Sequence, residues 1–457
     1  MPHNERSAIF SLSLIMAFRM LGLFMILPVF SVYAAKLPGS TSFLIGMALG
    51  IYGLTQACLQ LPFGMLSDKI GRKPIICIGL ILFAAGSILA ALSHSITGII
   101  LGRALQGAGA IGSTCIALVA DLTCDENRSK AMAFIGMSIG LAFMAALIIG
   151  PLLNTWFHLN GIFWATALFA AIGLLLLFTC IPTPPKLIVH DDSEAITARL
   201  KKIVCHRELL RLDIGVACSH AILMATFIAI PMLLTHTLQL NEPHQIALYL
   251  IVLCLSFFAM VPFIIIAEKK RHMKGIFCGA VFIIGLTQCL LLFFHNTLIE
   301  VALMLFLFFT AFTLLEASLP SLVSKIAPIR LKGTATGIYS SSQFLGIFIG
   351  GSVGGWLYGQ FHLTGIFLFG TLVASIWLIL ASTMKQPPYL STFIFKHAAD
   401  IEKINAYYSN LLRIKGVHEV AFMPDDNLIY IKADKQIIDE NELRNLIQQG
   451  TLREEGV

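Results

Sequence analysis

A few polar side chains interrupt long apolar stretches of this sequence, and they are the first candidates for chemistry. Arg19, Arg103, His220 and Glu316 are ionisable residues of this kind, and Gln106 follows Arg103 by three positions. A charge within the hydrocarbon of a bilayer is costly, so such residues normally face the protein interior or a water-filled path. We therefore expect them to line a polar passage through a membrane protein.

Glu316 and His220 can each bind and release a proton, whereas an arginine side chain stays protonated. A carboxyl group and an imidazole in the same half of the chain could take up a proton from one side of a membrane and release it to the other. Arg103 could hold an anion or act on a proton-binding neighbour, so we assign Glu316, His220 and Arg103 to proton coupling. The alternative is that these are separate buried polar groups, with Arg103 tying neighbouring helices together.

Gln56 and Gln60 lie one helical turn apart in the second apolar stretch. Together with Arg19, they are our candidates for the lining of a central cavity.

The elements that carry these residues are membrane helices. Only 12% of the 457 residues are charged and 57% are hydrophobic, whereas soluble proteins carry about 25% charged residues. An apolar stretch of about 20 residues crosses the ~30 Å hydrocarbon core of a bilayer. We predict twelve such spans, at residues 8–34, 42–66, 74–93, 97–120, 131–154, 160–181, 212–238, 245–268, 275–294, 298–324, 334–357 and 363–384.

The predicted fold is an all-α membrane bundle in two six-helix halves, followed by a small α+β domain. The first bundle is 1–181, a cytoplasmic linker is 182–211, the second bundle is 212–386, and the last domain is 389–457. At an offset of 204 residues the halves share several positions, among them Leu118 and Leu322. Duplicated halves place a substrate site at their interface and permit alternating access.

Positive charge sets the orientation that we expect. With both termini in the cytoplasm, twenty Lys and Arg residues of the membrane part fall on the cytoplasmic side and only Lys36 falls outside. The first span contains Arg19 and lacks a cleavage site, so we interpret it as a retained helix rather than a secretion signal. The ten cysteines lie mostly in apolar runs without a C-x-x-C pair, so we expect neither a metal site nor a disulfide framework.

The last 68 residues differ in composition, with 8 Lys or Arg and 11 Asp or Glu. Their pattern predicts the order β-α-β-β-α of a ferredoxin-like domain. A closing strand within 451–457 would be short and acidic, so closure of the sheet stays open. The predicted elements are a strand at 392–395, a helix at 398–412, strands at 418–423 and 428–432, and a helix at 440–449.

A short polar turn with the sequence GMLSDKIGRKP joins the second and third spans at residues 64–74 and resembles motif A of the major facilitator superfamily. The resemblance implies a clasp between Asp68, Arg72 and Asp121, with Asp68 also at the N-terminal end of span eleven, where a helix favours an anion. We expect this clasp to hold the inner gate shut in the outward-open state. Its motif residues are Gly64, Asp68, Gly71, Arg72 and Lys73.

Small residues recur in spans five and eleven, and small residues at helical spacing allow close packing and bending. The set in span five partly matches motif C of drug:proton antiporters in the same superfamily, although Ala146 and Asn154 stand where glycines are expected. GRALQGAGA around Arg103 resembles the family's motif B. The packing and bending candidates are Gly136, Gly140, Gly150 and Pro151 in span five and Gly346, Gly350 and Gly354 in span eleven.

Most of the chain resembles the YajR-type transporters of this superfamily. The resemblance implies a multi-pass protein of the bacterial inner membrane that exports a small amphipathic or drug-like solute in exchange for protons. The last domain would then be a sensing module or a brace for the bundle. The segments that carry the likeness are LGLFMILPV (21–29), LSDKIGRKP (66–74), NRSKAMAFIG (127–136), EASLPSLVSK (316–325) and SSQFLGIFIGGSVGGW (341–356).

Two other functions fit the same residues. A proton-coupled uptake symporter would use the same helices, and a membrane sensor could signal through the C-terminal domain. An enzyme is disfavoured because the sequence contains no nucleophile motif and no paired carboxylates. We expect a small-molecule substrate, protons and the lipid bilayer as partners, no nucleic acid, no cofactor or metal, and a monomer.

Overall fold

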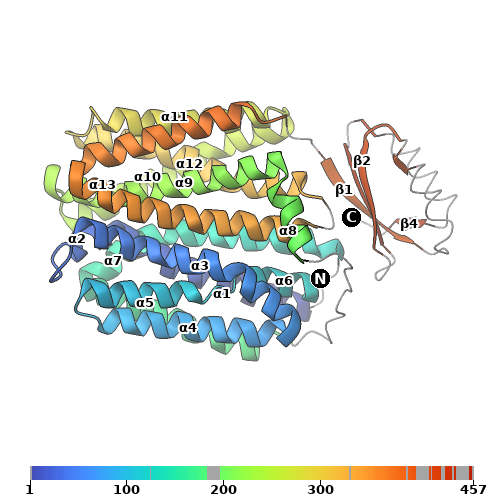
Figure 1. Cartoon of the computed structure of the whole chain (residues 1–457), viewed down its shortest axis with the longest axis horizontal. Coiled ribbons are helices and arrows are strands. Elements are labelled where there is room, and N and C mark those ends of the chain that lie inside the picture. The colour runs from blue at the N-terminus through green and yellow to red at the C-terminus, as the bar shows by residue number, and fades with distance from the viewer. Residues whose placement is uncertain are drawn as a thin grey trace.

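Figure 1 shows the computed structural model, a bundle of long helices with a small strand-containing domain at one end. It describes residues 3–123, 125–182, 196–328, 331–386, 390–397, 411–412, 414–423, 428–434, 437–438 and 452–454. We call the end of the bundle next to the C-terminal domain the domain end, and the opposite end the far end. The helices of the first half are α1 (His3–Phe24), α2 (Leu27–Ala34), α3 (Ser42–Ile70), α4 (Arg72–Leu92), α5 (Ile96–Ala108), α6 (Gly112–Leu122) and α7 (Asp125–Thr179). The later elements are α8 (Ile196–Val204), α9 (Arg207–Met232), the π-helical turn η1 (Leu233–Thr237), α10 (Glu242–Lys269), α11 (Met273–Leu291), α12 (Leu298–Ile326), α13 (Lys332–Ser382), β1 (Leu390–His397), β2 (Val417–Met423), β3 (Leu428–Asp434) and β4 (Leu452–Glu454).

Within the described residues, ten helical segments are long and apolar enough to cross a membrane. Eight of them each correspond to one predicted span, whereas the segments in α7 and α13 each cover two. A straight helix of the 55 residues in α7 would be about 80 Å long, more than twice the ~30 Å hydrocarbon core. Each of these two helices therefore needs a break.

The break falls at one residue in each helix. His158 in α7 has φ 56° and ψ −171°, and His362 in α13 has φ 52° and ψ −140°, both outside the helical region. The two histidines are 204 residues apart, which is the offset that relates the two halves in sequence. Because both lie in gaps predicted between spans, the ten segments correspond to the twelve predicted spans.

Glycines on α13 bring its backbone against α9 in the second half. A Cβ atom at Gly346 would lie 2.2 Å from the carbonyl oxygen of Ala217, and one at Gly350 would lie 2.2 Å from that of Ala221. These distances are far below van der Waals contact, so only glycine permits this approach. Gly354 continues the same row against Ala225.

Glycines of α3, which belongs to the first half, bring its backbone against the other side of α13. A Cβ atom at Gly46 would lie 2.1 Å from the carbonyl oxygen of Gly351, and one at Gly53 would lie 2.4 Å from that of Phe344. We call this contact, made by Gly46 and Gly53 with Phe344 and Gly351, the α3–α13 seam. It joins the two halves through their backbones.

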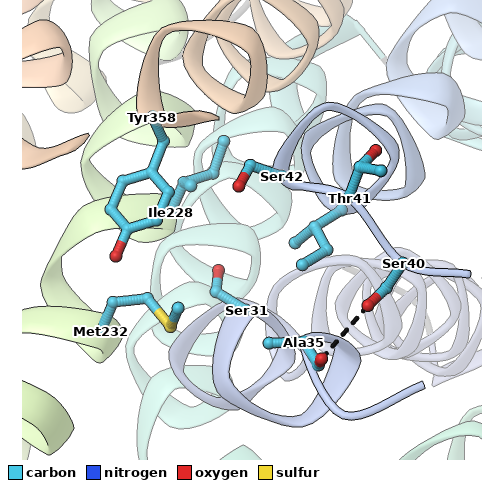
Figure 2. A pocket seen from close by; sticks show the side chains of 9 residues that line it. Ser31, Ala35, Ser40, Thr41, Ser42, Ile228, Met232 and Tyr358 are labelled. Atoms are coloured by element: carbon cyan, nitrogen blue, oxygen red, sulfur yellow. Dashed lines mark hydrogen bonds between the residues drawn. The ribbon is translucent and has the colours of Figure 1, made fainter. Parts of the chain in front are cut away.

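The halves also meet at the far end through α2 and α9. The Ser31 hydroxyl donates a hydrogen bond to the carbonyl oxygen of Phe227 at 3.2 Å. Beside it, Figure 2 shows a small pocket into which Ser42 at the start of α3, Met232 at the end of α9 and Tyr358 of α13 project. The far end is therefore a region of contact between the halves.

The linker between the halves is partly helical. It contains α8, and α9 begins at Arg207, five residues before the predicted span. The extension is a polar turn: His206 caps the helix by accepting a hydrogen bond from the Leu209 amide, and Glu208 forms an ion pair with Arg211. Hydropathy alone does not detect such a turn, because its residues lie outside the apolar run.

The C-terminal domain contains a four-stranded antiparallel sheet in the order β2-β3-β1-β4. The sequence left open whether a closing strand forms within 451–457. The structure has this strand as β4, which pairs with β1. This closes the expected ferredoxin-like order. Of the predicted helix at 398–412 only residues 411–412 are described, and they are helical; the predicted helix at 440–449 lies outside the described residues.

Candidate functional site

The structure brings Glu316 and His220 together inside the second half. Glu316 on α12 faces His220 on α9, with 3.6 Å between Glu316 Oε2 and His220 Nε2. Gln343 on α13 lies between them, with its Nε2 atom 2.8 Å from His220 Nε2 and 3.4 Å from Glu316 Oε1. We call these three residues, contributed by three helices, the carboxyl–imidazole site.

The hydrogen bonds of His220 indicate which ring nitrogen carries its proton. Nδ1 lies 3.1 Å from the carbonyl oxygen of Val216, and a carbonyl can only accept, so Nδ1 is the donor. In a neutral ring Nε2 is then an acceptor, which suits the amide donor of Gln343. A second proton would go to Nε2, directly beside the carboxylate of Glu316. Because the Gln343 amide and a protonated Nε2 would both be donors, the amide would have to turn away from the ring when that proton binds.

The two titratable groups differ in how far the protein buries them. The Glu316 side chain is 30% exposed although it lies within a membrane-spanning helix, whereas that of His220 is 1% exposed. Phe312, one turn before Glu316, covers the imidazole with a ring-to-ring distance of 5.6 Å. A proton would therefore reach the site through the carboxyl group.

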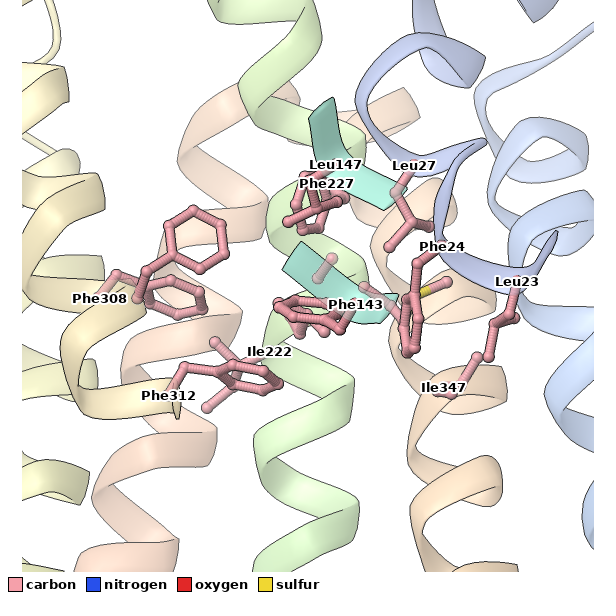
Figure 3. Close-up of a cluster of buried hydrophobic side chains, with 14 of the residues drawn as sticks. Leu23, Phe24, Leu27, Phe143, Leu147, Ile222, Phe227, Phe308, Phe312 and Ile347 are labelled. Carbon is pink, nitrogen blue, oxygen red and sulfur yellow. The ribbon is translucent and has the colours of Figure 1, made fainter. Parts of the chain in front are cut away.

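An aromatic cluster next to this site connects the two halves (Figure 3). Phe143 of α7 lies 5.6 Å from Phe312 of α12 and packs edge-on against Phe24 of α1 at 4.8 Å. Leu23 and Ile347 extend the cluster toward α3. We call it the aromatic bridge.

A second polar network lies inside the first half. Arg19 donates hydrogen bonds from Nη2 to Tyr52 Oη at 3.2 Å and to Gln56 Oε1 at 2.8 Å. Gln56 in turn donates to Gln60 Oε1 at 2.9 Å. All three candidate cavity residues thus belong to one network, but their side chains are buried rather than open to a cavity.

Arg103 joins the same network from α5. It donates from Nη1 to Gln106 Oε1 at 2.9 Å, and its guanidinium carbon lies 4.9 Å from the centre of the Tyr52 ring. Inserting an arginine into the membrane centre costs about 2.5–3.5 kcal/mol. A desolvated cation–π contact returns about 2 kcal/mol, so the ring offsets much of that cost. We call Arg19, Tyr52, Gln56 and Arg103 the arginine site.

Arg72 holds the polar turn between α3 and α4 at the domain end. Gly71 has φ 106°, which L side chains rarely adopt, so the turn needs a glycine. The Arg72 guanidinium donates to Asp121 Oδ2 at 3.1 Å and to Ser67 Oγ at 2.7 Å, and it forms an ion pair with Asp68. Two further motif residues anchor this turn: Lys73 donates to the carbonyl oxygen of Ile181 at 2.7 Å, and Gly64 faces Ser113 on α6.

The C-terminal domain contacts the second half through buried charges on β3. Lys432 donates from Nζ to the carbonyl oxygens of Ala327 at 2.5 Å and Lys325 at 3.3 Å, at the end of α12. Burial lowers the pKa of Lys432, while nearby Glu419 opposes that shift. Asp434 forms an ion pair with Arg271, between α10 and α11. We call these contacts the docking contacts.

The comparison with known proteins decides the family. The sequence profile of the Major Facilitator Superfamily matches residues 12–351 and 212–416. The chain belongs to this family. It is therefore a multi-pass membrane transporter, as predicted, and not an enzyme.

Relatives within the superfamily cover most of the chain. It is 44% identical to the inner membrane transport protein YajR of Escherichia coli (strain K12) over 449 residues, which are 98% of this chain and 99% of that protein. It is 37% identical to an uncharacterized transporter of Buchnera aphidicola subsp. Baizongia pistaciae over 82% of this chain and 96% of that protein. Quinolone resistance protein NorA of Staphylococcus aureus (strain COL) is 26% identical over 79% of this chain and 92% of its own length.

Solved structures of other transporters share the fold. A D-xylose-proton symporter has a TM-score of 0.66 at 15% identity, covering 84% of this chain and 98% of its own. A bacterial homolog of the human lysosomal transporter Spinster, inward-facing and occupied, has a TM-score of 0.67 at 13% identity with the same coverage. At these identities the likeness shows the fold alone.

Two expectations from the superfamily motifs differ from the structure. Asp68 does not contact the start of α13: its side chain is 61% exposed and its described ion pair is with Arg72. The resemblance implies that contact for a state closed at the domain end, and the contact between α3 and α13 described here is the α3–α13 seam. Gly136 and Gly140 have no atom within 4 Å of a Cβ position, so they do not mediate close packing here. Gly150, next to Pro151, does: its Cβ would lie 1.9 Å from the carbonyl oxygen of Met25.

The structure does not bring Arg103 together with the other two residues that the sequence assigned to proton coupling. Its described contacts are with Gln106 and Tyr52 of the first half, not with Glu316 or His220. The prediction also missed two residues. Gln343 contacts both Glu316 and His220, and Tyr52 contacts both Arg19 and Arg103. Each is a polar side chain within a predicted span, and that is the signal that could have found them.

Proposed function

We propose that this chain is a proton-driven exporter that exchanges a small amphipathic solute for protons by alternating access. The observation that carries the proposal is the carboxyl–imidazole site, where Glu316, His220 and Gln343 meet inside a membrane bundle. Titratable side chains within membrane segments are rare, and proton relays are one of the functions that they serve. The cytoplasmic side is taken to be the domain end, following the distribution of Lys and Arg.

Exchange requires that proton and cargo occupy the protein alternately. A proton on the carboxyl–imidazole site removes or balances the charge of Glu316, and its release restores that charge beside the aromatic bridge. Because the bridge contains residues of both halves, a change of charge next to it alters the free energy of the contact between them. An apolar cargo placed there would respond to the same change.

Alternation also requires that the contacts at the two ends form in turn. The α3–α13 seam supports a state closed near the far end, and the exposed Asp68 carboxylate, which pairs with Arg72 and not with the start of α13, supports an open domain end. In the opposite state, Asp68 would approach the N-terminal end of α13, which attracts an anion. The ion pair between Arg72 and Asp121 would keep the turn ready for that contact.

The test is proton movement in proteoliposomes that contain a pH-sensitive dye and have an acidic lumen. NorA is named for quinolone resistance, so a quinolone is a reasonable first member of a panel of aromatic amphipathic cargoes. In an exchanger, added cargo enters as protons leave, and the lumenal pH rises faster than in empty liposomes. A fall in lumenal pH would indicate symport, and no change with any cargo would favour the sensor alternative.

A matched pair of variants on α12 separates the site from general damage. Glu316→Gln should reduce the cargo-dependent pH change to the level of empty liposomes, since it removes the titratable group. Glu300→Gln is the control, because Glu300 completes a capping box at the start of the same helix and glutamine can fill that role. Equal exchange by both variants would contradict the proposal.

A further inference from the structure

The two arginines of the arginine site have no anionic partner in the part of the chain that the structure describes. Among the residues that the structure describes, Arg72, Arg211 and Arg271 each form an ion pair with a carboxylate. Within the same part of the chain, Arg19 and Arg103 bind only amide and hydroxyl oxygens and aromatic rings. Two permanent positive charges therefore share Tyr52 without a compensating negative charge.

Several N–H donors of these arginines also have no hydrogen-bond acceptor among the described residues. Arg19 Nε and Arg103 Nε and Nη2 are buried and have no hydrogen-bond partner among the described residues. Arg103 is 0% exposed and Arg19 is 2% exposed. Buried donors are normally satisfied, and a guanidinium is shaped to bind a carboxylate or another planar anion through two parallel hydrogen bonds. The site thus has the charge and the free donors that such a group would need.

The site lies behind a contact that alternating access would open. Tyr52 packs on Phe344 of the opposite half with 6.3 Å between ring centres, and its neighbour Gly53 belongs to the α3–α13 seam. Parting of the seam would remove Phe344 from Tyr52 and uncover the guanidinium groups behind it. The site is therefore closed in this state and becomes accessible when the halves separate.

An apolar surface adjoins the site. Leu23, one turn after Arg19 on α1, and Ile347, one turn after Phe344 on α13, both belong to the aromatic bridge (Figure 3). We propose that Arg19 and Arg103 bind the anionic group of an amphipathic cargo whose aromatic or aliphatic body lies against the aromatic bridge. This inference rests on the proposed transport function and names its substrate class as organic anions.

The test measures equilibrium binding to the full-length protein in lipid nanodiscs, with no pH gradient. The probes are radiolabelled 2-naphthoate and its neutral analogue 2-naphthamide, which have the same ring system. We expect naphthoate to bind at least tenfold more tightly than naphthamide. Equal affinity for the two would overturn the inference, as would binding of chloride without binding of naphthoate.

Variants assign the preference to the two arginines. Arg19→Gln and Arg103→Gln should each weaken naphthoate binding about tenfold or more and leave the affinity for naphthamide unchanged, and Arg103→Lys should restore part of the loss. Lys36→Gln is the control, because it removes an exposed positive charge outside the site. Unchanged naphthoate affinity in folded Arg19→Gln and Arg103→Gln proteins would refute the assignment. If either variant does not fold, the comparison of the two probes on the unaltered protein still decides.

The outcome is independent of proton coupling. Naphthoate binding with no proton exchange would refute the proposed antiport and leave the anion site standing. Proton exchange driven only by neutral or cationic cargoes, without naphthoate binding, would refute the anion site and leave antiport standing.

Discussion

The two halves of the bundle bury polar groups of different kinds. The first half encloses Arg19 and Arg103, whose charge is permanent, in a shell of amide and hydroxyl groups. The second half encloses Glu316 and His220, whose charge depends on bound protons. The folds of the halves are related, yet the buried charge of the first half is constant, whereas that of the second half changes with the number of bound protons. Under the proposed function, this difference would separate the binding of a charged cargo from the binding of the proton.

The halves also differ at the turns between their second and third spans. In the first half, Arg72 pairs with Asp68 and Asp121 of the same half. In the second half, Arg271 pairs with Asp434 of the C-terminal domain. One turn is thus held by its own bundle and the other by the appended domain.

The largest effect is expected from removal of the imidazole. His220→Ala should abolish pH-driven exchange in proteoliposomes, because Glu316 loses the partner with which it shares a proton. Gln288→Ala is the matched control, since Gln288 is a buried amide of the same half that donates to Thr226. If the His220→Ala protein still exchanges at the unaltered rate, the charge of the second half does not drive exchange through His220.

The next effect concerns the seam between the halves. Gly46→Ala places a methyl group against the Gly351 backbone, and such overpacking costs about 1–3 kcal/mol. A free-energy change of that size shifts a two-state equilibrium by about five- to 150-fold, here toward a far end that is open. Maleimide labelling of a cysteine introduced at Ser42, with a reagent that does not cross membranes, should speed up accordingly.

Gly136→Ala is the control for the seam, because nothing lies within 4 Å of its Cβ position. Identical labelling rates in the Gly46→Ala and Gly136→Ala proteins would show that the seam does not limit opening.

A smaller effect is expected at the docking contacts. Lys432→Met removes a buried charged donor from the last carbonyl groups of α12, a loss of about 1.5–3 kcal/mol. Hydrogen exchange of the β3 amides in the full-length protein should become correspondingly faster, while Lys415→Met, at an exposed lysine of the same domain, should leave it unchanged. Unaltered protection in the Lys432→Met protein would mean that other contacts hold the domain.

The smallest effect is expected at the clasp. Asp121→Asn breaks one partly exposed ion pair, which is worth about 0.2–1 kcal/mol. Thermal unfolding in nanodiscs should show a slight loss at low salt and none at high salt, because salt screens exposed charges. A loss that persists at high salt would indicate that the carboxylate has a structural role beyond charge.

The membrane bundle could be predicted well because its signal is local. About 20 apolar residues in a row suffice to indicate a span, and the gaps predicted between spans contain His158 and His362. The C-terminal strands likewise followed from alternating side chains. The start of α9 at Arg207 could not be predicted, since its polar turn has no hydropathy signal.

The candidate site could be predicted only in part. Sequence gives the depth of a residue in the membrane but not the neighbour that its helix presents it to. Glu316 and His220 lie together, as the sequence hypothesis proposed, whereas Arg103 lies against Tyr52. Gln343 was missed because its amide side chain is uncharged, whereas the search of the spans started from ionisable residues.

The glycine rows of α13 have a further consequence for any opening of the bundle. Where two helices touch through glycines, no side chains stand between the peptide groups of one and those of the other. If α3 and α13 separate, main-chain groups at Gly46 and Gly351 are uncovered together with the side chains of Tyr52 and Phe344. This part of α3 and α13 is apolar in sequence, but its uncovered backbone groups would bind water, and water could accompany a solute along it.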